Sequence, residues 1–232
     1  MITDEKPVIL YGKQEKNLTK MHKYNIGVLF DLDGVLLDTE GIYSKFWGAV
    51  DEQYPTHVEN FTEVIKGSNL HKILHEYFPN DEVRTQVTTM LDDFQKDMSY
   101  DFFPGALKWI QLLHEAHIPM CVVTSSDQKK MEAVYRQHPE FRGYFKDVVV
   151  GEMVQKPKPD PECFLLGAKL IQVDIAHCYV FEDSINGLNS AMASGAKVIG
   201  LSTTNPATAL EGKAHLIIDN FQGFTIDKML KL

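Results

Sequence analysis

Several features that mark specialised classes of protein are missing from these 232 residues. No apolar run approaches the roughly 18 residues that span a bilayer, and the polar N-terminus has no continuous apolar core of the kind found in secretory signals. Lys and Arg total 23 against 32 Asp and Glu, so the formal net charge is −9. An acidic chain without a polybasic segment is a poor ligand for anionic lipid or for nucleic acid. We therefore expect neither a membrane nor a nucleic acid as partner.

Cysteine is also scarce. The three cysteines, Cys121, Cys163 and Cys178, contain no C-x-x-C pair. Their small and odd number does not fit a disulfide framework. Cys121 and Cys178 stand in apolar runs, which favours reduced thiols in the core of a cytoplasmic protein. Neither G-x-G-x-x-G nor G-x-x-x-x-G-K-[ST] occurs, which argues against a nicotinamide-dependent dehydrogenase and a P-loop nucleotidase.

Short apolar runs alternate with amphipathic segments over most of the chain. This alternation predicts an α/β fold, a doubly wound parallel sheet of the Rossmann-like kind. In such folds ligands bind at the carboxyl ends of the strands, so the loops that begin at Asp31, Thr124, Glu152 and Glu182 should lie close together. The expected strands cover 26–30, 120–123, 148–150, 179–181, 198–201 and 216–218. One expected helix begins near 104, and three others cover 127–137, 161–171 and 184–194.

Residues 41–100 follow a different pattern. They carry helical periodicity at 42–50, 70–78 and 83–98 and no strand signal. A length of 232 residues corresponds to about 1.5 typical domains. We therefore predict a core of 25–40 and 101–232, an inserted helical cap domain at 41–100, and an N-terminal extension at 1–24 with a short strand at 8–11.

The densest chemical signal directly follows the first expected strand. Asp31-Leu32-Asp33-Gly34 places two carboxylates at a strand end, where hard oxygen ligands suit Mg²⁺. A carboxylate that attacks and a second one that handles protons also suit phosphoryl transfer. The structural alternative is an Asx-rich turn, which is common after strands.

This segment resembles the first motif of the haloacid dehalogenase-like (HAD) hydrolase superfamily, and three further motifs follow in the family's order. Together they span residue 26 to about 200. The α-helical insertion after the first motif is similar to that of the phosphatase and β-phosphoglucomutase group. The matching segments are Asp31–Glu40, Val122–Ser126, Lys158–Phe164 and Phe181–Gly187.

The resemblance implies a role for each motif residue. Asp31 would be the nucleophile that forms an aspartyl-phosphate, and Asp33 the general acid/base. Thr124, through its hydroxyl, and Ser125, through its backbone N–H, would bind the transferred phosphoryl group. Lys158 would neutralise Asp31 and the phosphate. Mg²⁺ would be held by Asp31, the backbone carbonyl of Asp33, Asp183 and, in support, Glu182.

Each assignment has an ordinary structural alternative. Thr124 and Ser125 could form a helix N-cap pair, and Glu182 and Asp183 another capping cluster. Lys158 could be a solvated loop lysine. Lys156, which also precedes a proline, competes with Lys158, but only Lys158 leaves the aromatic Phe164 at the family's spacing.

Four residues of the expected cap could choose the substrate: Tyr43 and Trp47 on its first helix, and Lys66 and Asn69 around Gly67 in a loop. Packing inside the cap explains the two aromatics equally well. Sugar-phosphate mutases place an arginine near this loop, and none lies between Trp47 and Arg84, which weighs against a mutase. His71 and His75 are spaced i, i+4 but lack a His-Glu-x-x-His context, so a solvated face is expected.

The sequence thus predicts a Mg²⁺-dependent phosphomonoester hydrolase of a small metabolite, a sugar or polyol phosphate, working as a monomer or weak homo-oligomer. The first alternative is a β-phosphoglucomutase-type phosphomutase, which returns the phosphoryl group to a sugar. The second is a phospho-receiver-like signalling domain, although receivers place the acceptor Asp in mid-chain. The third is a catalytically silent binding protein, for which loss of Asp31 or Asp33 would be expected; both are present.

Overall fold

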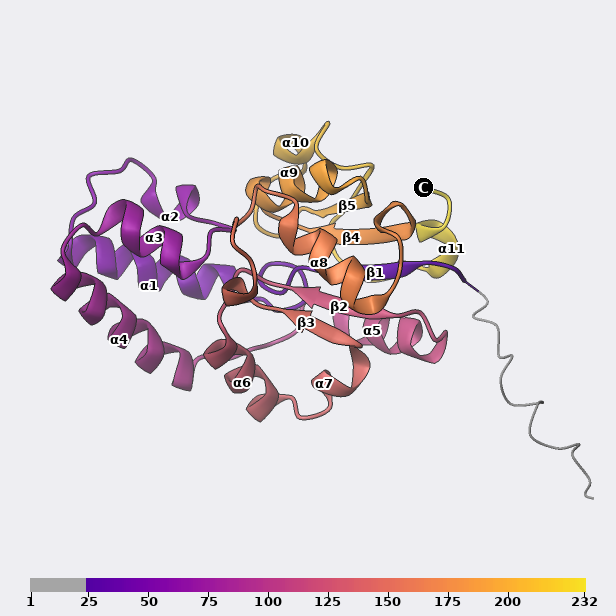
Figure 1. The fold of residues 1–232 in the computed structure, drawn as a ribbon, viewed down its shortest axis with the longest axis horizontal. Helices are drawn as coiled ribbons and strands as arrows, with labels where there is room; N and C mark the ends of the chain where they lie inside the picture. Colours follow the sequence, from indigo (N-terminus) through magenta and orange to yellow (C-terminus); the bar gives the residue numbers. More distant parts are fainter. Residues whose placement is uncertain (1–23) are drawn as a thin grey trace, which may run out of the picture.

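The computed structural model describes residues 24–232, so the strand expected at 8–11 lies outside the described residues. Six parallel strands form one sheet with the order β3-β2-β1-β4-β5-β6 (Figure 1). The strand order reverses between β1 and β4, and this confirms the doubly wound α/β fold predicted from the sequence. The strands are β1 (Gly27–Phe30), β2 (Met120–Val123), β3 (Asp147–Val149), β4 (Cys178–Glu182), β5 (Lys197–Leu201) and β6 (Leu216–Ile218).

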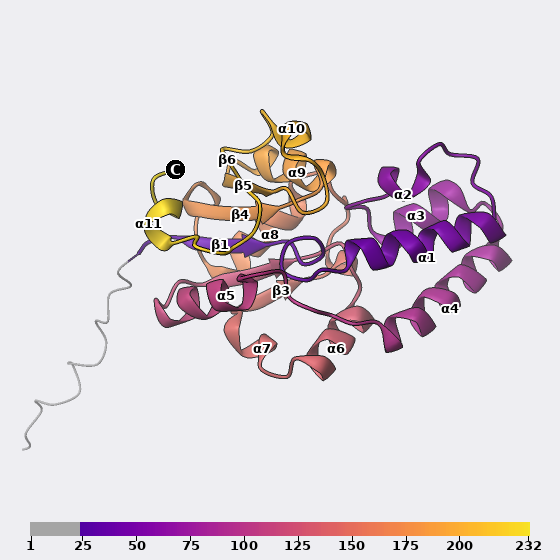
Figure 2. The ribbon, with the colours of Figure 1, turned by 180° about the vertical axis from the view of Figure 1, so that it is seen from behind.

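Helices cover both faces of the sheet because its strands are apolar on both sides. Figures 1 and 2 show α5 (Ala106–Glu115) and α8 (Glu162–Ile171) on opposite faces. Successive residues of β1 divide between two buried clusters, with Val28 and Phe30 in one and Leu29 in the other. The α5 face also carries α6 (Gln128–Gln137) and α7 (Phe141–Tyr144), and the α8 face carries α9 (Ile185–Ser194).

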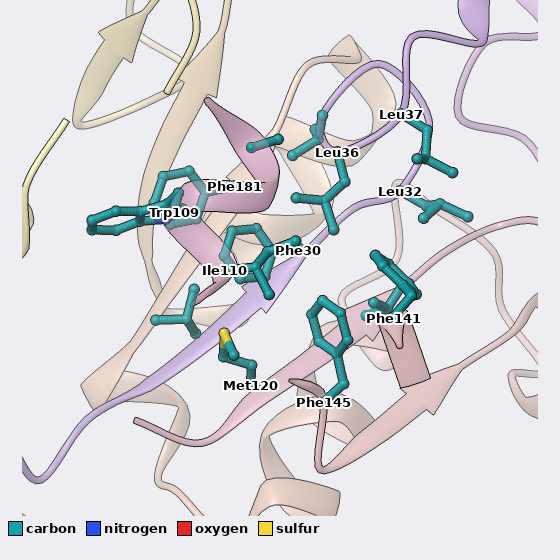
Figure 3. Close-up of a cluster of buried hydrophobic side chains, with 14 of the residues drawn as sticks. Phe30, Leu32, Leu36, Leu37, Trp109, Ile110, Met120, Phe141, Phe145 and Phe181 are labelled. Atoms are coloured by element: carbon teal, nitrogen blue, oxygen red, sulfur yellow. The ribbon is translucent and has the colours of Figure 1, made fainter. Parts of the chain in front are cut away.

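The core on the α5 face combines aromatic rings with aliphatic side chains (Figure 3). The rings of Phe30 and Phe181 stack with centroids 5.0 Å apart, and Trp109 meets Phe181 edge-on at 6.1 Å. Phe30 immediately precedes Asp31, and Phe181 immediately precedes Glu182. The packing therefore fixes the ends of β1 and β4 where the site begins.

Four helices form a separate unit, which we call the helical unit: α1 (Glu40–Gln53), α2 (Phe61–Val64), α3 (Leu70–Tyr77) and α4 (Asp81–Asp97). They share a buried cluster of their own and lie beyond the carboxyl ends of the strands (Figures 1 and 2). The division into domains stays a prediction.

The two chain segments that join the helical unit to the sheet run side by side. The backbone N–H of Asp38 donates to the carbonyl of Asp101 at 2.8 Å, and that of Phe103 donates to Leu36 at 3.0 Å. Leu37 and Phe102 form an antiparallel bridge between these bonds. The chain therefore enters and leaves the helical unit at one place.

The sequence pattern missed several short helices. Besides α2 and α7 these are α10 (Ala207–Leu210), α11 (Ile226–Met229) and two 3₁₀ turns at Gly151–Met153 and Ile175–His177. Elements of three or four residues are too short to display a 3.6-residue period. Within residues 24–232, the structure contains no helix with the length and apolar character needed to cross a membrane.

Candidate active site

A buried lysine joins the ends of the two central strands. Strand register pairs Phe30 with Phe181, so the next residues, Asp31 and Glu182, leave the sheet side by side. The Nζ of Lys158 lies 2.5 Å from Asp31 Oδ1 and 2.7 Å from Glu182 Oε2. Only 2% of the Lys158 side chain is exposed, so all three charges meet away from bulk water.

The structure separates the two candidate lysines. The side chain of Lys156 is 73% exposed, and its Nζ lies 3.9 Å from a carboxylate oxygen of Asp160. The ammonium of Lys158 lies 5.0 Å from the centroid of the Phe164 ring. The aromatic residue that distinguished Lys158 in the sequence therefore contacts the ammonium directly, and the alternative of a solvated loop lysine is wrong for Lys158.

Glu182 is held by the two residues that precede α9, of which Ser184 is the N-cap. Its Oε1 accepts the backbone N–H groups of Asp183 (3.1 Å) and Ser184 (3.0 Å) and the Ser184 hydroxyl (2.9 Å). A Cβ at Gly187 would lie 2.0 Å from the Glu182 carboxylate, so only glycine leaves room for it. Both oxygens of Glu182 are engaged, which orients this carboxylate toward Lys158.

The Asp183 carboxylate has an oxygen that is free to accept a further ligand. Its Oδ1 is buried and has no hydrogen-bond partner among the described residues. Gly34, with φ +78°, makes room for this side chain, because a Cβ there would lie 2.1 Å from Asp183 Oδ2. The Asn205 amide donates to the Asp183 carbonyl at 3.1 Å. The loop after β5, which the sequence analysis did not single out, therefore supports this position.

The three carboxylates fit a divalent cation. One oxygen each of Asp31, Glu182 and Asp183 lies within 4.8 Å of the others, and Lys158 is the one cation in contact with this group in the described part of the chain. Burial, followed by the negative charge of Glu182, raises the pKa of both Asp31 and Asp183 well above the usual range. Burial lowers the pKa of Lys158, but Asp31 and Glu182 outweigh this effect and raise it. A hard cation would satisfy the orphaned oxygen of Asp183 and offset the excess negative charge.

Asp33 lines the same cavity as Asp31 and Asp183, but its carboxylate binds a different set of side chains. Its carboxylate accepts hydrogen bonds from the Thr39 hydroxyl, from the Ser126 hydroxyl (3.0 Å) and from the ammonium of Lys130, with which it forms an ion pair. Lys130 was not among the site residues predicted from the sequence. Its spacing of four residues from the core residue Val134 was the available signal, because it puts both on one face of α6.

Thr124 and Ser125 follow β2 at the same edge of the sheet. Thr124 is buried, and its hydroxyl oxygen accepts the backbone N–H of Ser126 at 3.0 Å. The Ser125 hydroxyl donates to the carbonyl of Gly67 in the helical unit at 2.8 Å. Asp127, rather than either of these residues, caps α6 by accepting from the Lys130 N–H at 2.9 Å. Binding of a phosphoryl group by Thr124 and Ser125 stays a prediction.

The helical unit closes over the site through the loop around Gly67. The Asn186 amide donates to the Lys66 carbonyl at 3.1 Å, so two core side chains, Ser125 and Asn186, hold this loop. A cavity of about 110 Å³ remains between loop and sheet. Its lining includes Asp31, Asp33, Glu40, Lys66, Thr124, Ser125, Lys130 and Asp183.

The four residues expected to choose the substrate differ in their surroundings. Tyr43, Trp47 and Lys66 line the cavity. Trp47 also packs edge-on against Phe46, with ring centroids 5.2 Å apart. The side chain of Asn69 accepts the Lys72 N–H at 2.9 Å and so caps α3. A role in substrate choice stays a prediction for all four.

Glu40, the last residue of the first motif, has no role in the sequence analysis but lines the cavity. Burial, followed by the negative charge of Asp33, raises the pKa of Glu40 to about 7. Its position could have been inferred from the sequence, because Glu40 ends the first motif and begins the helix that follows it. His71 and His75, the i, i+4 histidine pair, are exposed, and their rings lie tilted against each other with centroids 4.2 Å apart.

The family model described as haloacid dehalogenase-like hydrolase matches residues 28–201. The chain belongs to this family. The matched range contains all four motifs and the whole cluster around Lys158. Family membership and fold, both predicted from the sequence, are thereby confirmed.

Relatives of this haloacid dehalogenase-like hydrolase include phosphatases. It is 25% identical over 210 residues to hexitol phosphatase A of Escherichia coli, covering 87% of this chain and 94% of the relative. It is 27% identical over 222 residues to the bifunctional riboflavin kinase/FMN phosphatase of Arabidopsis thaliana, covering 90% of this chain and 56% of the relative. These names support the predicted enzyme class, a phosphatase of this family.

The fold of the haloacid dehalogenase-like hydrolase has solved counterparts. A HAD hydrolase of family IA, variant 3, from Entamoeba histolytica superposes with a TM-score of 0.75 at 23% identity, covering 89% of this chain and 98% of the other. The coverage includes most of the described residues, so the sheet and the helical unit occur together in that protein as well.

Gly67 offers a test of how closely the helical unit must approach. Its φ is +76°, and a Cβ there would lie 2.6 Å from the Ser184 hydroxyl. A left-handed alanine costs roughly 1–2 kcal/mol, and relief of this strain and of the contact with Ser184 would move the loop away from the cavity. We therefore expect Gly67→Ala to lower kcat/KM about 10-fold. The matched control is Gly48→Ala on α1, where a Cβ meets nothing within 4 Å. Equal kcat/KM values for the two variants would contradict the expectation.

Proposed function

We propose that the protein is a Mg²⁺-dependent phosphomonoester hydrolase that acts on a small phosphorylated metabolite, a sugar or polyol phosphate, through an aspartyl-phosphate. The observation that carries the proposal is the ion pair of the buried Lys158 with Asp31 at the end of β1. A lysine in this position lets a carboxylate approach an anion. The hexitol phosphatase relative supports the substrate class.

The reaction would proceed in two displacements at phosphorus, with Asp31 as the nucleophile of the first and the leaving group of the second. The Asp31 carboxylate attacks phosphorus, the ester P–O bond breaks, and Asp33 gives a proton to the departing oxygen. Water then attacks the aspartyl-phosphate, with Asp33 as the base, and releases phosphate and free Asp31. Lys158, the Thr124 hydroxyl and the Ser125 N–H would bind the phosphoryl oxygens.

Magnesium would be held by Asp31, Asp183 and the Asp33 carbonyl, with Glu182 in support. When bound, it would neutralise charge on the phosphoryl group. The orphaned Asp183 oxygen and the raised pKa of Asp31 and Asp183 support this ligand set.

The surroundings of the site support a small substrate. The cavity of about 110 Å³ has room for a compact polar molecule, and its wall carries Glu40, Lys66 and Gln95 beside the motif residues. The net charge of −9 supports the absence of nucleic acid as partner. Three free, buried cysteines support a reducing, cytoplasmic compartment. We further propose that the protein works as a monomer or a weak homo-oligomer.

A phosphate-release screen tests the function directly. The panel contains hexose phosphates, hexitol phosphates, glycerol phosphate and nucleoside monophosphates. It also includes β-glucose 1-phosphate with a sugar bisphosphate primer, to detect isomerisation. Release of phosphate from a sugar or polyol phosphate is the expected result. Isomerisation of the glucose phosphate without release would favour the mutase instead.

Metal removal provides a separate prediction. Activity should disappear in EDTA and return on addition of Mg²⁺, because the excess of buried carboxylates over Lys158 must be neutralised before an anion can bind. Calorimetric titration should show Asp183→Asn binding Mg²⁺ at least about 10-fold more weakly than the wild type. Full activity in chelator, or an unchanged affinity in that variant, would reject the metal assignment.

A further inference from the structure

Lys130 is a second buried lysine that the family motifs do not include. It lies in the first turn of α6 and its side chain is 1% exposed. Lysine is almost never buried to this extent unless a partner compensates its charge. The compensation here comes from Asp33, with which Lys130 forms an ion pair. A buried charge of this kind raises the question of what it holds in place.

The ammonium of Lys130 touches both parts of the molecule. On the sheet side it contacts Asp33 and donates to the Ser126 hydroxyl at 3.1 Å. On the side of the helical unit it lies 4.3 Å from the centroid of the Tyr43 ring, on α1. The Tyr43 hydroxyl in turn accepts a hydrogen bond from Gln95, on α4, at 3.0 Å.

The three donors around Asp33 come from different segments. Thr39 stands at the entry to the helical unit, Ser126 follows β2, and Lys130 belongs to α6. Two of them are neutral hydroxyls, so Lys130 supplies the only full positive charge among these donors. A charge-assisted bond is roughly twice as strong as a neutral one. Lys130 therefore contributes most to the orientation of this carboxylate.

We propose that Lys130 is a positioning residue: it orients the Asp33 carboxylate for proton exchange and ties that orientation to the packing of the helical unit through the Tyr43 ring. The inference rests on the proposed function, in which Asp33 is the acid/base. While Tyr43 covers the ammonium, water is excluded and the attraction between Lys130 and Asp33 is stronger. Displacement of α1 would hydrate the ammonium and weaken its hold on Asp33.

The proposal predicts a selective defect. Expulsion of 4-nitrophenolate requires no proton, whereas attack of water on the aspartyl-phosphate requires Asp33 as base. In Lys130→Met, the first-turnover burst of 4-nitrophenolate from 4-nitrophenyl phosphate should stay close to the wild-type rate. Steady-state turnover should fall about 100-fold, as is typical for loss of general base catalysis. A burst that falls in parallel with turnover would overturn the proposal, because a structural defect would impair both steps.

Lys129 supplies the matched control. It is the adjacent lysine of the same helix, it is 65% exposed, and it also contacts the helical unit, through Asp92 at 2.6 Å. Lys129→Met removes the same charge and should leave both rates near the wild type. Lys130→Arg keeps a cation beside Asp33 and should restore part of the steady-state rate. An Arg variant no better than the Met variant would count against an electrostatic role.

A double-mutant cycle tests whether Lys130 acts through Asp33. In an Asp33→Asn background, Lys130→Met should cause no further loss of steady-state turnover, since residues that act as one unit are not additive. Additive losses would overturn the proposal. If Lys130→Met does not fold, Tyr43→Leu takes its place, because it removes the ring over the ammonium. Its steady-state turnover should fall, by less than in Lys130→Met, while its burst rate stays near the wild type. A parallel loss of both rates in Tyr43→Leu would also overturn the proposal. A wild type that releases no phosphate from any ester would reject the proposed function instead.

Discussion

Asp31→Asn is expected to lose at least about 10³-fold in turnover, since removal of the attacking group leaves only background reaction. The exchange keeps the shape of a buried side chain and relieves its repulsion with Glu182, while it weakens the bond to Lys158. These effects oppose each other, so the melting temperature should shift by less than about 4 °C. Phosphate release and circular dichroism measure the two quantities.

The control lies seven residues away in the same motif. Asp38 is exposed and contributes only its backbone N–H to a described hydrogen bond, with Asp101. Asp38→Asn makes the identical chemical change and should retain wild-type turnover. Rates near the wild type in Asp31→Asn would refute its assignment as nucleophile, and an unfolded Asp31→Asn protein would mean that the charge is needed for the fold.

Lys158→Met should damage both stability and activity. Removing the ammonium leaves Asp31 and Glu182 as uncompensated buried charges, which costs about 3–5 kcal/mol. Turnover should drop about 10²- to 10³-fold, in the range seen for loss of one preorganised electrostatic contact. Thermal unfolding without metal, and phosphate release with Mg²⁺, are the two measurements.

The stability loss in Lys158→Met should depend on pH in a defined direction. Without the ammonium, the folded-state pKa of Asp31 rises further above the unfolded value of about 4. A carboxyl whose pKa is raised by folding favours the folded state at low pH and loses that contribution as the pH increases. The gap in melting temperature between variant and wild type should therefore widen above about pH 4. Lys156→Met, at an exposed ion pair of 3.9 Å, should show no such gap.

The motif residues could be predicted from the sequence because a parallel sheet brings its strand ends together. Asp31 and Glu182 follow apolar runs, and the family order supplied Lys158. The six strands were predictable for the same reason, since buried parallel strands read as continuous apolar runs.

Other parts of the site depend on contacts that no local pattern contains. Lys130 lies on a polar stretch of α6. Its spacing from Val134 places it on the inner face of this helix, but its partners, Tyr43 and Asp33, come from distant segments that the spacing does not indicate. Asn69 flanks the loop as expected, but its side chain caps α3, and a capping residue and a substrate contact look alike in a sequence. The support from Asn205 comes from a loop without periodicity.

The adjoining linkers of the helical unit have a consequence for how such an enzyme can vary. Asp38 and Asp101 are 63 residues apart in the chain, yet their backbones share a hydrogen bond of 2.8 Å. Residues 39–100 therefore connect two paired segments, in the way that a turn connects the two strands of a β-hairpin. Lengthening such a closed loop costs little entropy, so its size and shape can change without strain on the strands. The helical unit can thus change in size and shape while Asp31 and Glu182 keep their positions at the ends of β1 and β4.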